Sequence, residues 1–322
     1  MRKFIFPLLL SILLLVPACG GEGGSNPASP AVGNITYLIT QNYGAETVLE
    51  EAVSYQPDRS VMEGLFATKA EVETAYGGDF VSVINGLSTQ NSGLTGERYD
   101  WFYYVNGIFA DVGALDYLLL PGDQIWWDYH PWKVSQGTPA VVGCWPEPFL
   151  HGFRGKVKET VVLPVPSMAE QGKKLQAALQ ELGVQSTAVR ELDGTSAEEL
   201  GARKGPIIAV GAWPELARYK WLAEFNEAWR RNGTFLHFSA DGLELLDHSG
   251  QVVRTVQGSA GVIMATAEGN GDDSPLWIVT GSDAQGTAAA LDILIEQPEK
   301  IKAAYSIVIL PDEVMKLPAM RE

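Results

Sequence analysis

Cysteine is scarce in this chain of 322 residues, which contains only Cys19 and Cys144. Two cysteines cannot build a framework of several disulfides, and they are too few for a zinc site made of thiolates. We therefore expect ordinary hydrophobic cores to stabilise the protein, and a chain of 34.9 kDa is long enough to form them.

Basic residues are also few, since 23 Lys and Arg stand against 39 Asp and Glu and give a formal net charge of −16. A basic patch that binds nucleic acid or an anionic surface needs clustered Lys and Arg, because its contacts are made to phosphates. The composition therefore predicts no nucleic-acid partner. Acidity of this kind favours solubility outside the cell.

Catalytic motifs are missing as well. The four His residues are scattered, and the sequence has no GxSxG, HExxH or CxxC pattern. Asp272 and Asp273 lie in a loop rich in Gly and Asp, where solvation is the default explanation. Paired carboxylates can act in glycosidases without a local motif, so this alternative stays open. The sequence predicts a protein that is not an enzyme and that carries no cofactor or metal.

The chain has one long apolar run, from Phe4 to Val16, which follows Arg2 and Lys3. A short basic start, an apolar run and small residues before a cysteine are typical of a secretory signal peptide, here residues 1–18. The run is shorter than the ~20 residues of a transmembrane helix. We therefore exclude this segment from the fold.

The tetrapeptide Val16-Pro17-Ala18-Cys19 resembles the bacterial lipobox. The resemblance implies that Cys19 is alkylated with diacylglycerol and becomes the first residue, so that acyl chains such as palmitate hold the protein on a bacterial membrane, outside the cytoplasm. The alternative is an ordinary secretory signal that leaves Cys19 as a free thiol. Residues 19–34 are rich in Gly, Ser, Pro and Ala, which predicts a flexible tether.

The remaining chain divides by composition into two predicted domains. Residues 35–133 are aromatic-rich and β-like, whereas residues 159–322 alternate apolar strands with helical stretches. Residues 134–158 form a linker rich in Pro and Gly, and its aromatic residues predict that it packs between the domains. We predict an α+β fold, with a small hairpin-rich β-domain containing one helix, followed by an α/β sandwich domain.

Local patterns predict the elements of both domains. Ser60 and Glu63 form a capping-box pattern at the start of a short helix, and Asn85-Gly86 and Asn106-Gly107 are turn pairs. The predicted strands of the β-domain are residues 35–40, 80–84, 101–105 and 125–129. In the second domain we predict strands at 160–165, 184–190, 206–210, 234–238, 251–256, 262–267, 276–280 and 305–310, and helices at 168–182, 216–231 and 284–296. Ser167 is the expected cap of the first of these helices, and Ser282 or Asp283 that of the last.

Several motifs of the first domain occur in a recognisable order. They are Phe80-Val81-Ser82-Val83-Ile84-Asn85-Gly86-Leu87, then Trp101-Phe102-Tyr103-Tyr104-Val105-Asn106-Gly107, Gly113 with Tyr117, and Gly122-Asp123-Gln124-Ile125-Trp126-Trp127. In this order they resemble the small C-terminal β-domain of transcobalamin and intrinsic factor and its bacterial relatives. The resemblance covers about a third of the chain and implies a fold and a ligand class, the corrinoids. The helical barrel that completes the corrinoid site of the animal carriers has no counterpart here.

A corrin is a broad disc edged with amides, so its site would offer flat aromatic surface and a few polar groups. The predicted ligand-binding residues are Trp101, Tyr103, Asn106, Trp126, Trp127, Tyr129, Trp132 and Trp145. Core packing is the alternative for each ring. One face of a small sheet can be core, however, and the aromatic residues exceed what one face requires, which favours an exposed ligand surface. His130 is an additional candidate for contacting cobalt.

The sequence therefore predicts a lipid-anchored extracytoplasmic binding protein that captures a small molecule, with a corrinoid as the expected ligand, and passes it to a membrane transporter. The alternative is a structural or adhesive surface lipoprotein that binds a protein or a cell-wall glycan.

Overall fold

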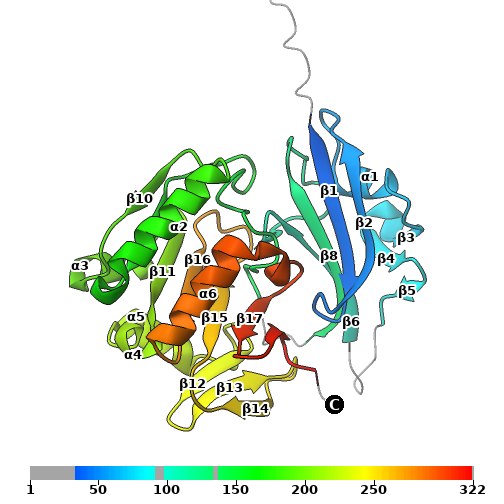
Figure 1. The fold of residues 1–322 in the computed structure, drawn as a ribbon. Coiled ribbons are helices and arrows are strands. Elements are labelled where there is room, and N and C mark those ends of the chain that lie inside the picture. The colour runs from blue at the N-terminus through cyan, green and yellow to red at the C-terminus, as the bar shows by residue number, and fades with distance from the viewer. Residues whose placement is uncertain (1–32, 91–97, 133–136, 321–322) are drawn as a thin grey trace, which may run out of the picture. The chain divides into compact units, whose positions relative to one another are not determined.

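The computed structural model describes residues 33–90, 98–132 and 137–320 (Figure 1). It contains both strands and helices in several sheets, so the α+β class is confirmed. The signal peptide and Cys19 lie outside the described residues, as does all of the tether except its last two residues. No helix among the described residues is long and apolar enough to span a membrane.

The N-terminal sheet has the strand order β2-β1-β8-β6-β7. Strand β1 runs parallel to β8, and β8 and β6 are antiparallel. The β6–β7 turn contains Asn106 and Gly107 at φ angles of 51° and 76°, which confirms this predicted turn pair. The bounds are β1 Asn34–Gln41, β2 Glu46–Ser54, β6 Arg98–Val105, β7 Ile108–Phe109 and β8 Gln124–Trp132.

Helix α1 (Val61–Phe66) lies beside this sheet and begins at the predicted capping box. The Ser60 Oγ accepts from the Glu63 amide at 3.2 Å, and the Ser60 amide donates to Glu63 Oε2 at 2.8 Å. A small antiparallel sheet follows, made of β3 (Val72–Ala75), β4 (Phe80–Ile84) and β5 (Leu87–Ser88).

The C-terminal part contains a seven-stranded sheet of order β10-β9-β11-β16-β15-β17-β18. The first four strands in this order are parallel and the remaining neighbours are antiparallel. A separate antiparallel sheet of order β12-β13-β14 accompanies it. The bounds are β9 Thr160–Pro164, β10 Thr187–Val189, β11 Ile207–Ala212, β12 Leu236–Ser239, β13 Gly242–Leu246, β14 Val252–Val256, β15 Gly261–Thr266, β16 Leu276–Gly281, β17 Ser306–Ile309 and β18 Val314–Leu317.

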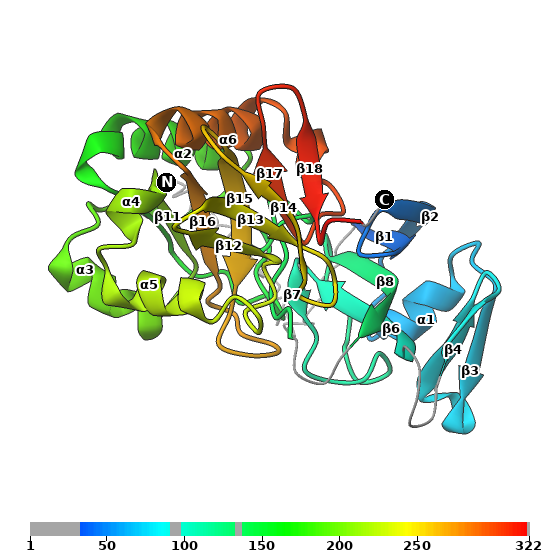
Figure 2. The same ribbon diagram turned by 90° about the horizontal axis from the view of Figure 1, so that it is seen from below.

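Helices α2 and α6 lie side by side on one face of the seven-stranded sheet, and α4 and α5 lie on the other (Figure 2). The Asp283 carboxylate accepts from the Gly286 amide at 2.8 Å, so Asp283 is the cap of α6, as predicted. The bounds are α2 Ala169–Glu181, α3 Gly194–Glu198, α4 Trp213–Leu216, α5 Lys220–Glu227 and α6 Ala284–Glu296.

Two local predictions were wrong here. Ser167 does not cap α2, because its hydroxyl donates to the Glu215 carboxylate and Met168 holds the cap position. The helix predicted at 216–231 is shorter in the structure, where α4 ends at Leu216 and α5 covers Lys220–Glu227. Tyr219 between them has an extended backbone, and its hydroxyl donates to the Leu192 carbonyl at 2.6 Å, so a tertiary contact overrides the helical pattern.

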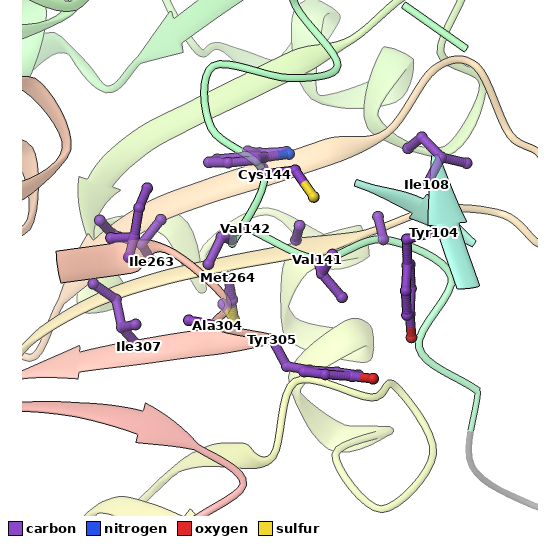
Figure 3. Packing of buried hydrophobic residues seen from close by; sticks show 14 of the residues in the cluster. Tyr104, Ile108, Val141, Val142, Cys144, Ile263, Met264, Ala304, Tyr305 and Ile307 are labelled. Atoms are coloured by element: carbon purple, nitrogen blue, oxygen red, sulfur yellow. The ribbon is translucent and has the colours of Figure 1, made fainter. Parts of the chain in front are cut away.

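The described part of the linker packs against both predicted domains, as its aromatic residues suggested. The Val141 amide donates to the Gly107 carbonyl at 2.9 Å, and the Ala303 amide donates to the Gly143 carbonyl at 3.1 Å. Figure 3 shows the side chains of Val141 and Val142 between Tyr104 and Ile108 of the β-domain and the C-terminal strands. One continuous cluster of buried side chains therefore runs through both predicted domains. The boundaries of these domains remain a prediction from the sequence.

Candidate functional site

Alternation along β6 and β8 places one set of rings on the side of the N-terminal sheet that faces α1. Trp101 packs on Tyr129 with ring centroids 5.1 Å apart, and Tyr103 stacks on Trp127 at 4.9 Å. On the neighbouring strand β1, the Tyr37 hydroxyl donates to the Val61 carbonyl of α1 at 2.8 Å. We call this the α1 side; it is the interior of the β-domain.

The opposite side of the same sheet faces the C-terminal part of the chain, and we call it the module side. Phe102 and Tyr104 of β6 and Trp126 of β8 lie here. Tyr305, which directly precedes β17, packs on Trp126 at 5.2 Å and on Tyr104 at 5.7 Å. Gly44 in the β1–β2 turn approaches this region so closely that an added Cβ would lie 1.9 Å from the Ala303 carbonyl oxygen. Both sides of the sheet are therefore covered.

This second cover corrects the argument that one face is core and the surplus rings are exposed. Trp101, Tyr103, Trp126, Trp127 and Tyr129 are all buried. Residues of the C-terminal domain, such as Tyr305, cover the module side of the sheet, which the sequence argument had expected to be exposed. These five side chains form no exposed ligand surface in this structure, whereas Trp132 and Trp145 are only partly buried.

Asn106 is fully buried, and its side chain holds three segments of the chain together by hydrogen bonds. Its Nδ2 donates to Asp123 Oδ1 at 2.9 Å and to the Gly152 carbonyl at 2.7 Å, while its Oδ1 accepts from the Gln124 amide at 2.8 Å. Both amide protons are thus used within the protein. The predicted role of Asn106 as a polar contact to a ligand is not supported by this geometry.

Trp145 lies apart from the other predicted site residues. Its ring packs on Phe149 and on Trp277, each with centroids 5.6 Å apart, which joins the linker to strand β16. Trp132, in contrast, lies at the end of β8, next to the junction between the two domains. The structure therefore separates the two partly buried tryptophans of the predicted site.

A pocket of about 250 Å³ opens at this junction, and we call it the interface pocket. Six aromatic rings and one imidazole contribute to its wall, together with Thr138 and Asn270. The described residues that line it are Tyr43, Phe102, Tyr104, Phe109, His130, Trp132, Gly137, Thr138, Phe235 and Asn270. Sequence reasoning identified Trp132 and singled out His130, but it missed the others as site residues.

His130 is held rigidly in the wall of the interface pocket. Its ring stacks between Tyr43 at 4.1 Å and Phe102 at 4.4 Å. Its Nδ1 lies 3.3 Å from the Tyr305 hydroxyl and 3.6 Å from Asp128 Oδ1. Burial raises the pKa of Tyr305 well above its ordinary value, so this hydroxyl stays protonated.

Asp128 supplies a buried negative charge behind His130. Its carboxylate accepts from the Tyr43 amide at 3.1 Å and from the Gly44 amide at 2.9 Å, and its side chain is fully buried. These two hydrogen bonds fix the β1–β2 turn, and through it the Tyr43 ring. In the described part of the chain, no group of three or more His, Cys, Asp or Glu residues is placed to hold a metal ion.

Other hollows fit a ligand site less well. A larger one, of about 690 Å³, lies between α6 and the β17–β18 hairpin, and charged groups such as Asp292, Lys300 and Lys316 line it. A hollow of about 210 Å³ on the α1 side contains Asp79 as its charged residue. Ligand pockets are mostly apolar with a few placed polar groups and prefer domain junctions, which favours the interface pocket.

Comparisons with known proteins find matches to part of the chain. Residues 58–131 match the family described as Domain of unknown function (DUF4430). A comparison with curated proteins finds no match. Among solved structures, the chain is similar to one described as "a putative metal binding protein" from Ruminococcus gnavus ATCC 29149. That match has 13% identity and a TM-score of 0.24, and it covers 31% of this chain and 99% of the other.

These matches assign no ligand. The family description states no function, and at this TM-score the structural likeness carries no argument about this chain. The resemblance to the transcobalamin β-domain stays a prediction from the sequence.

Proposed function

We propose that the protein is a lipid-anchored extracytoplasmic binding protein that captures a small molecule in the interface pocket. The observation that carries this proposal is the concentration of rings around a hollow at the junction of two sequence-distant segments. Aromatic side chains are normally used to fill space, so rings that border a cavity are available for contact with a ligand. Delivery of the ligand to a membrane transporter belongs to the same proposal.

The proposed role is binding without catalysis. The contact of Asp128, His130 and Tyr305 combines a carboxylate, an imidazole and a phenol, as some catalytic sites do. In this protein, however, stacked rings cover both faces of His130, and only 6% of the residue is exposed. The contact therefore serves to orient the pocket wall.

A corrinoid is the ligand that the sequence resemblance implies, and the size of the pocket limits how it would bind. A volume of about 250 Å³ is below the usual ~300–1,000 Å³ of sites that enclose a drug-sized ligand. A corrin disc would therefore lie across the opening and place one edge in the pocket. Thr138 and Asn270 would then be the partners for its peripheral amides.

The test is a titration of the full chain, in a neutral maltoside detergent, with cobalamin and cobinamide. Tryptophan fluorescence and corrin absorbance report binding, and we expect saturation at concentrations on the order of tens of micromolar. Trp132→Leu should weaken binding, whereas the matched change Trp229→Leu, outside the pocket, should not. Unchanged spectra with both corrinoids would remove this ligand class.

The anchoring part of the proposal depends on Cys19 and has its own test. Metabolic labelling with an alkyne-bearing fatty acid should mark the wild-type chain and fail with Cys19→Ser. Cys144→Ser is the matched control, because Cys144 is fully buried and burial raises the pKa of its thiol. Label that persists in Cys19→Ser would contradict the lipid anchor.

An adhesive role is the second candidate, and one exposed side chain favours it. Tyr76, between β3 and β4, is 80% exposed and lies 6.2 Å from the Phe80 ring. An exposed phenol ring of this kind suits stacking on a sugar or on a protein partner. Retention of the wild-type chain on cell-wall polymer, lost in Tyr76→Ala, would support adhesion; equal retention of both would oppose it.

A further inference from the structure

The rings of the interface pocket stand in two orientations and not in one stack. Tyr43, His130 and Phe102 form a column with interplanar angles of 27° and 18°. Phe235 stands at 71° to Tyr43, with centroids 5.4 Å apart, and Trp132 stands at 81° to Phe102, at 6.1 Å. We call Tyr43, Phe102, Trp132 and Phe235 the aromatic cage. His130 covers one face each of Tyr43 and Phe102, and rings in crossing planes border the pocket.

The charges around the aromatic cage favour a positive occupant. None of the described lining residues is a Lys or Arg, and the buried carboxylate of Asp128 lies directly behind His130. The whole chain carries a net charge of −16, which attracts cations toward its surface. Aromatic faces are themselves negative and attract cations placed over them.

One ring of the aromatic cage already binds a cation within the protein. The Arg98 guanidinium lies 5.4 Å from the Trp132 ring centroid, inside the range of a cation–π contact. One face of Trp132 is therefore covered by the guanidinium, so a ligand cation would have to use the other face or displace Arg98.

The few polar groups in the wall decide between kinds of cation. A primary ammonium must give up water and needs about three acceptors for its N–H groups. The uncharged polar side chains of the described wall are Tyr43, Tyr104, Thr138 and Asn270, and the two phenol hydroxyls are already engaged, that of Tyr43 with the Pro131 carbonyl and that of Tyr104 with Tyr305. A quaternary ammonium has no N–H groups to satisfy, and aromatic cages are the usual recognition element for it.

We propose that the interface pocket binds the quaternary ammonium group of a compact organic cation, of the chemical class of choline and betaine. The inference rests on the proposed function, since it names a ligand class for the same pocket. Thr138 and Asn270 are placed to contact a hydroxyl or carboxylate on such a ligand, while the aromatic cage holds the trimethylammonium group.

Calorimetric titration of the full chain, in a maltoside detergent without charged groups, tests this directly. The probes are choline, glycine betaine, tetramethylammonium and the neutral carbon analogue of choline, in which tert-butyl replaces trimethylammonium. We expect choline or betaine to bind at least about 10-fold more tightly than the neutral analogue, as removal of cation–π attraction at several rings requires. Equal affinity for choline and its neutral analogue, or no binding of any cation, overturns the inference.

Variants then assign binding to this pocket. Trp132→Leu and Phe235→Leu should each weaken choline binding by about 5- to 30-fold, and Trp132→Phe should restore most of the affinity, because it keeps an aromatic face. Tyr76→Leu is the control outside the pocket. Cation binding that is unaffected by Trp132→Leu and Phe235→Leu in folded protein overturns the site. The ligand comparison on wild-type protein decides the matter where a variant does not fold.

Failure of this inference and failure of the proposed function give different results. If cobinamide or the neutral analogue binds in a Trp132-dependent way while the cations do not, the pocket binds ligands and the cation class is wrong. If none of the probes binds, both are wrong. If the cations bind and corrinoids do not, the corrinoid assignment alone is removed.

Discussion

The two sides of the N-terminal sheet contain similar rings but differ in what lies among them. On the α1 side, Trp101, Tyr103 and Trp127 pack with elements of the same domain around a hollow of about 210 Å³. On the module side, Asp128 and His130 lie among the rings, and sequence-distant residues complete the wall of a hollow of about 250 Å³. Ring content alone therefore does not distinguish a packing core from the proposed ligand site; the two sides differ in their buried polar groups and in the segment that covers them.

The largest expected effect tests whether the α1 side is a packing core. Trp127→Ala should lower the free energy of unfolding by about 3–5 kcal/mol, because it removes a large buried ring. Its indole nitrogen has no hydrogen-bond partner among the described residues, so the loss reports packing. Urea denaturation measures it. If Trp127→Ala lowered the free energy of unfolding less than Trp132→Ala, a change at a half-buried residue, the α1 side would not be the packing core that we infer.

The second prediction concerns the charge on the module side. Asp128→Asn should cost about 2–3 kcal/mol, since charge-assisted hydrogen bonds to two backbone amides are replaced by weaker ones. Hydrogen exchange should become faster at the Tyr43 and Gly44 amides. Asp100→Asn is the control on the paired strand, because Asp100 accepts from its neighbour Trp101. Equal effects of the two changes would contradict a special role for Asp128.

The third prediction uses pH to probe the buried hydrogen bond between Asn106 and Asp123. Burial raises the pKa of Asp123 to about 6, and hydrogen bonds from the Leu120 amide and from Asn106 oppose this shift. Glu147 raises the pKa of Asp123 further and His151 lowers it, while the hydrogen bond to Glu147 raises the pKa of His151. Both folded-state pKa values thus lie above the unfolded ones, so the native state binds more protons.

Stability contributed by Asp123 should therefore fall as pH rises from about 4 to 6, and that contributed by His151 should fall as pH rises through its raised pKa. We expect Asp123 to account for a loss of about 1 kcal/mol between pH 5 and 7, measured by urea denaturation. Asp123→Asn should flatten this slope, and Asp111→Asn, an exposed control, should keep it. A wild-type slope of opposite sign that Asp123→Asn leaves unchanged would be evidence against the shift.

The smallest expected effect concerns an ion pair that joins the two domains at the surface. Lys302 Nζ lies 2.6 Å from Glu50 Oε2, and the side chains are 46% and 45% exposed. Lys302→Ala should cost about 0–1 kcal/mol and should matter less at high salt. Melting temperatures at low and high ionic strength measure this. A loss as large as that of Asp128→Asn would reverse our ranking of buried over exposed charge.

Local patterns predicted much of the fold, because they depend on neighbours in the chain. The capping box at Ser60 and the turn at Asn106-Gly107 are examples. Strand β2 was missed since its Glu46, Glu50 and Glu51 are poor strand formers. It forms at the sheet edge, where pairing with β1 is sufficient and charges are tolerated.

The predicted ligand-binding residues lie mostly on β6 and β8, and Trp101, Tyr103, Trp127 and Tyr129 lie on the α1 side, away from the interface pocket. Alternation separated Trp101 and Tyr103 from Phe102, yet it cannot show which side meets a distant domain. Phe235 and Tyr43 were not predicted as lining residues of the pocket, because their position there depends on tertiary contacts that no local sequence pattern indicates. His130 beside Pro131 was the one additional signal, and it identifies the strand end where the pocket lies.

The position of Tyr305, after all strands of the N-terminal sheet, has a consequence for biosynthesis. A polypeptide leaves the ribosome from its N-terminus, so strands β1, β6 and β8 are complete long before the residue that covers Trp126 and Tyr104 is made. Until Tyr305 is in place, the apolar module side of the sheet lacks its cover and can associate with other unfolded chains. A product terminated before Tyr305 should for this reason be prone to aggregate and to need a chaperone, however well its own strands pair.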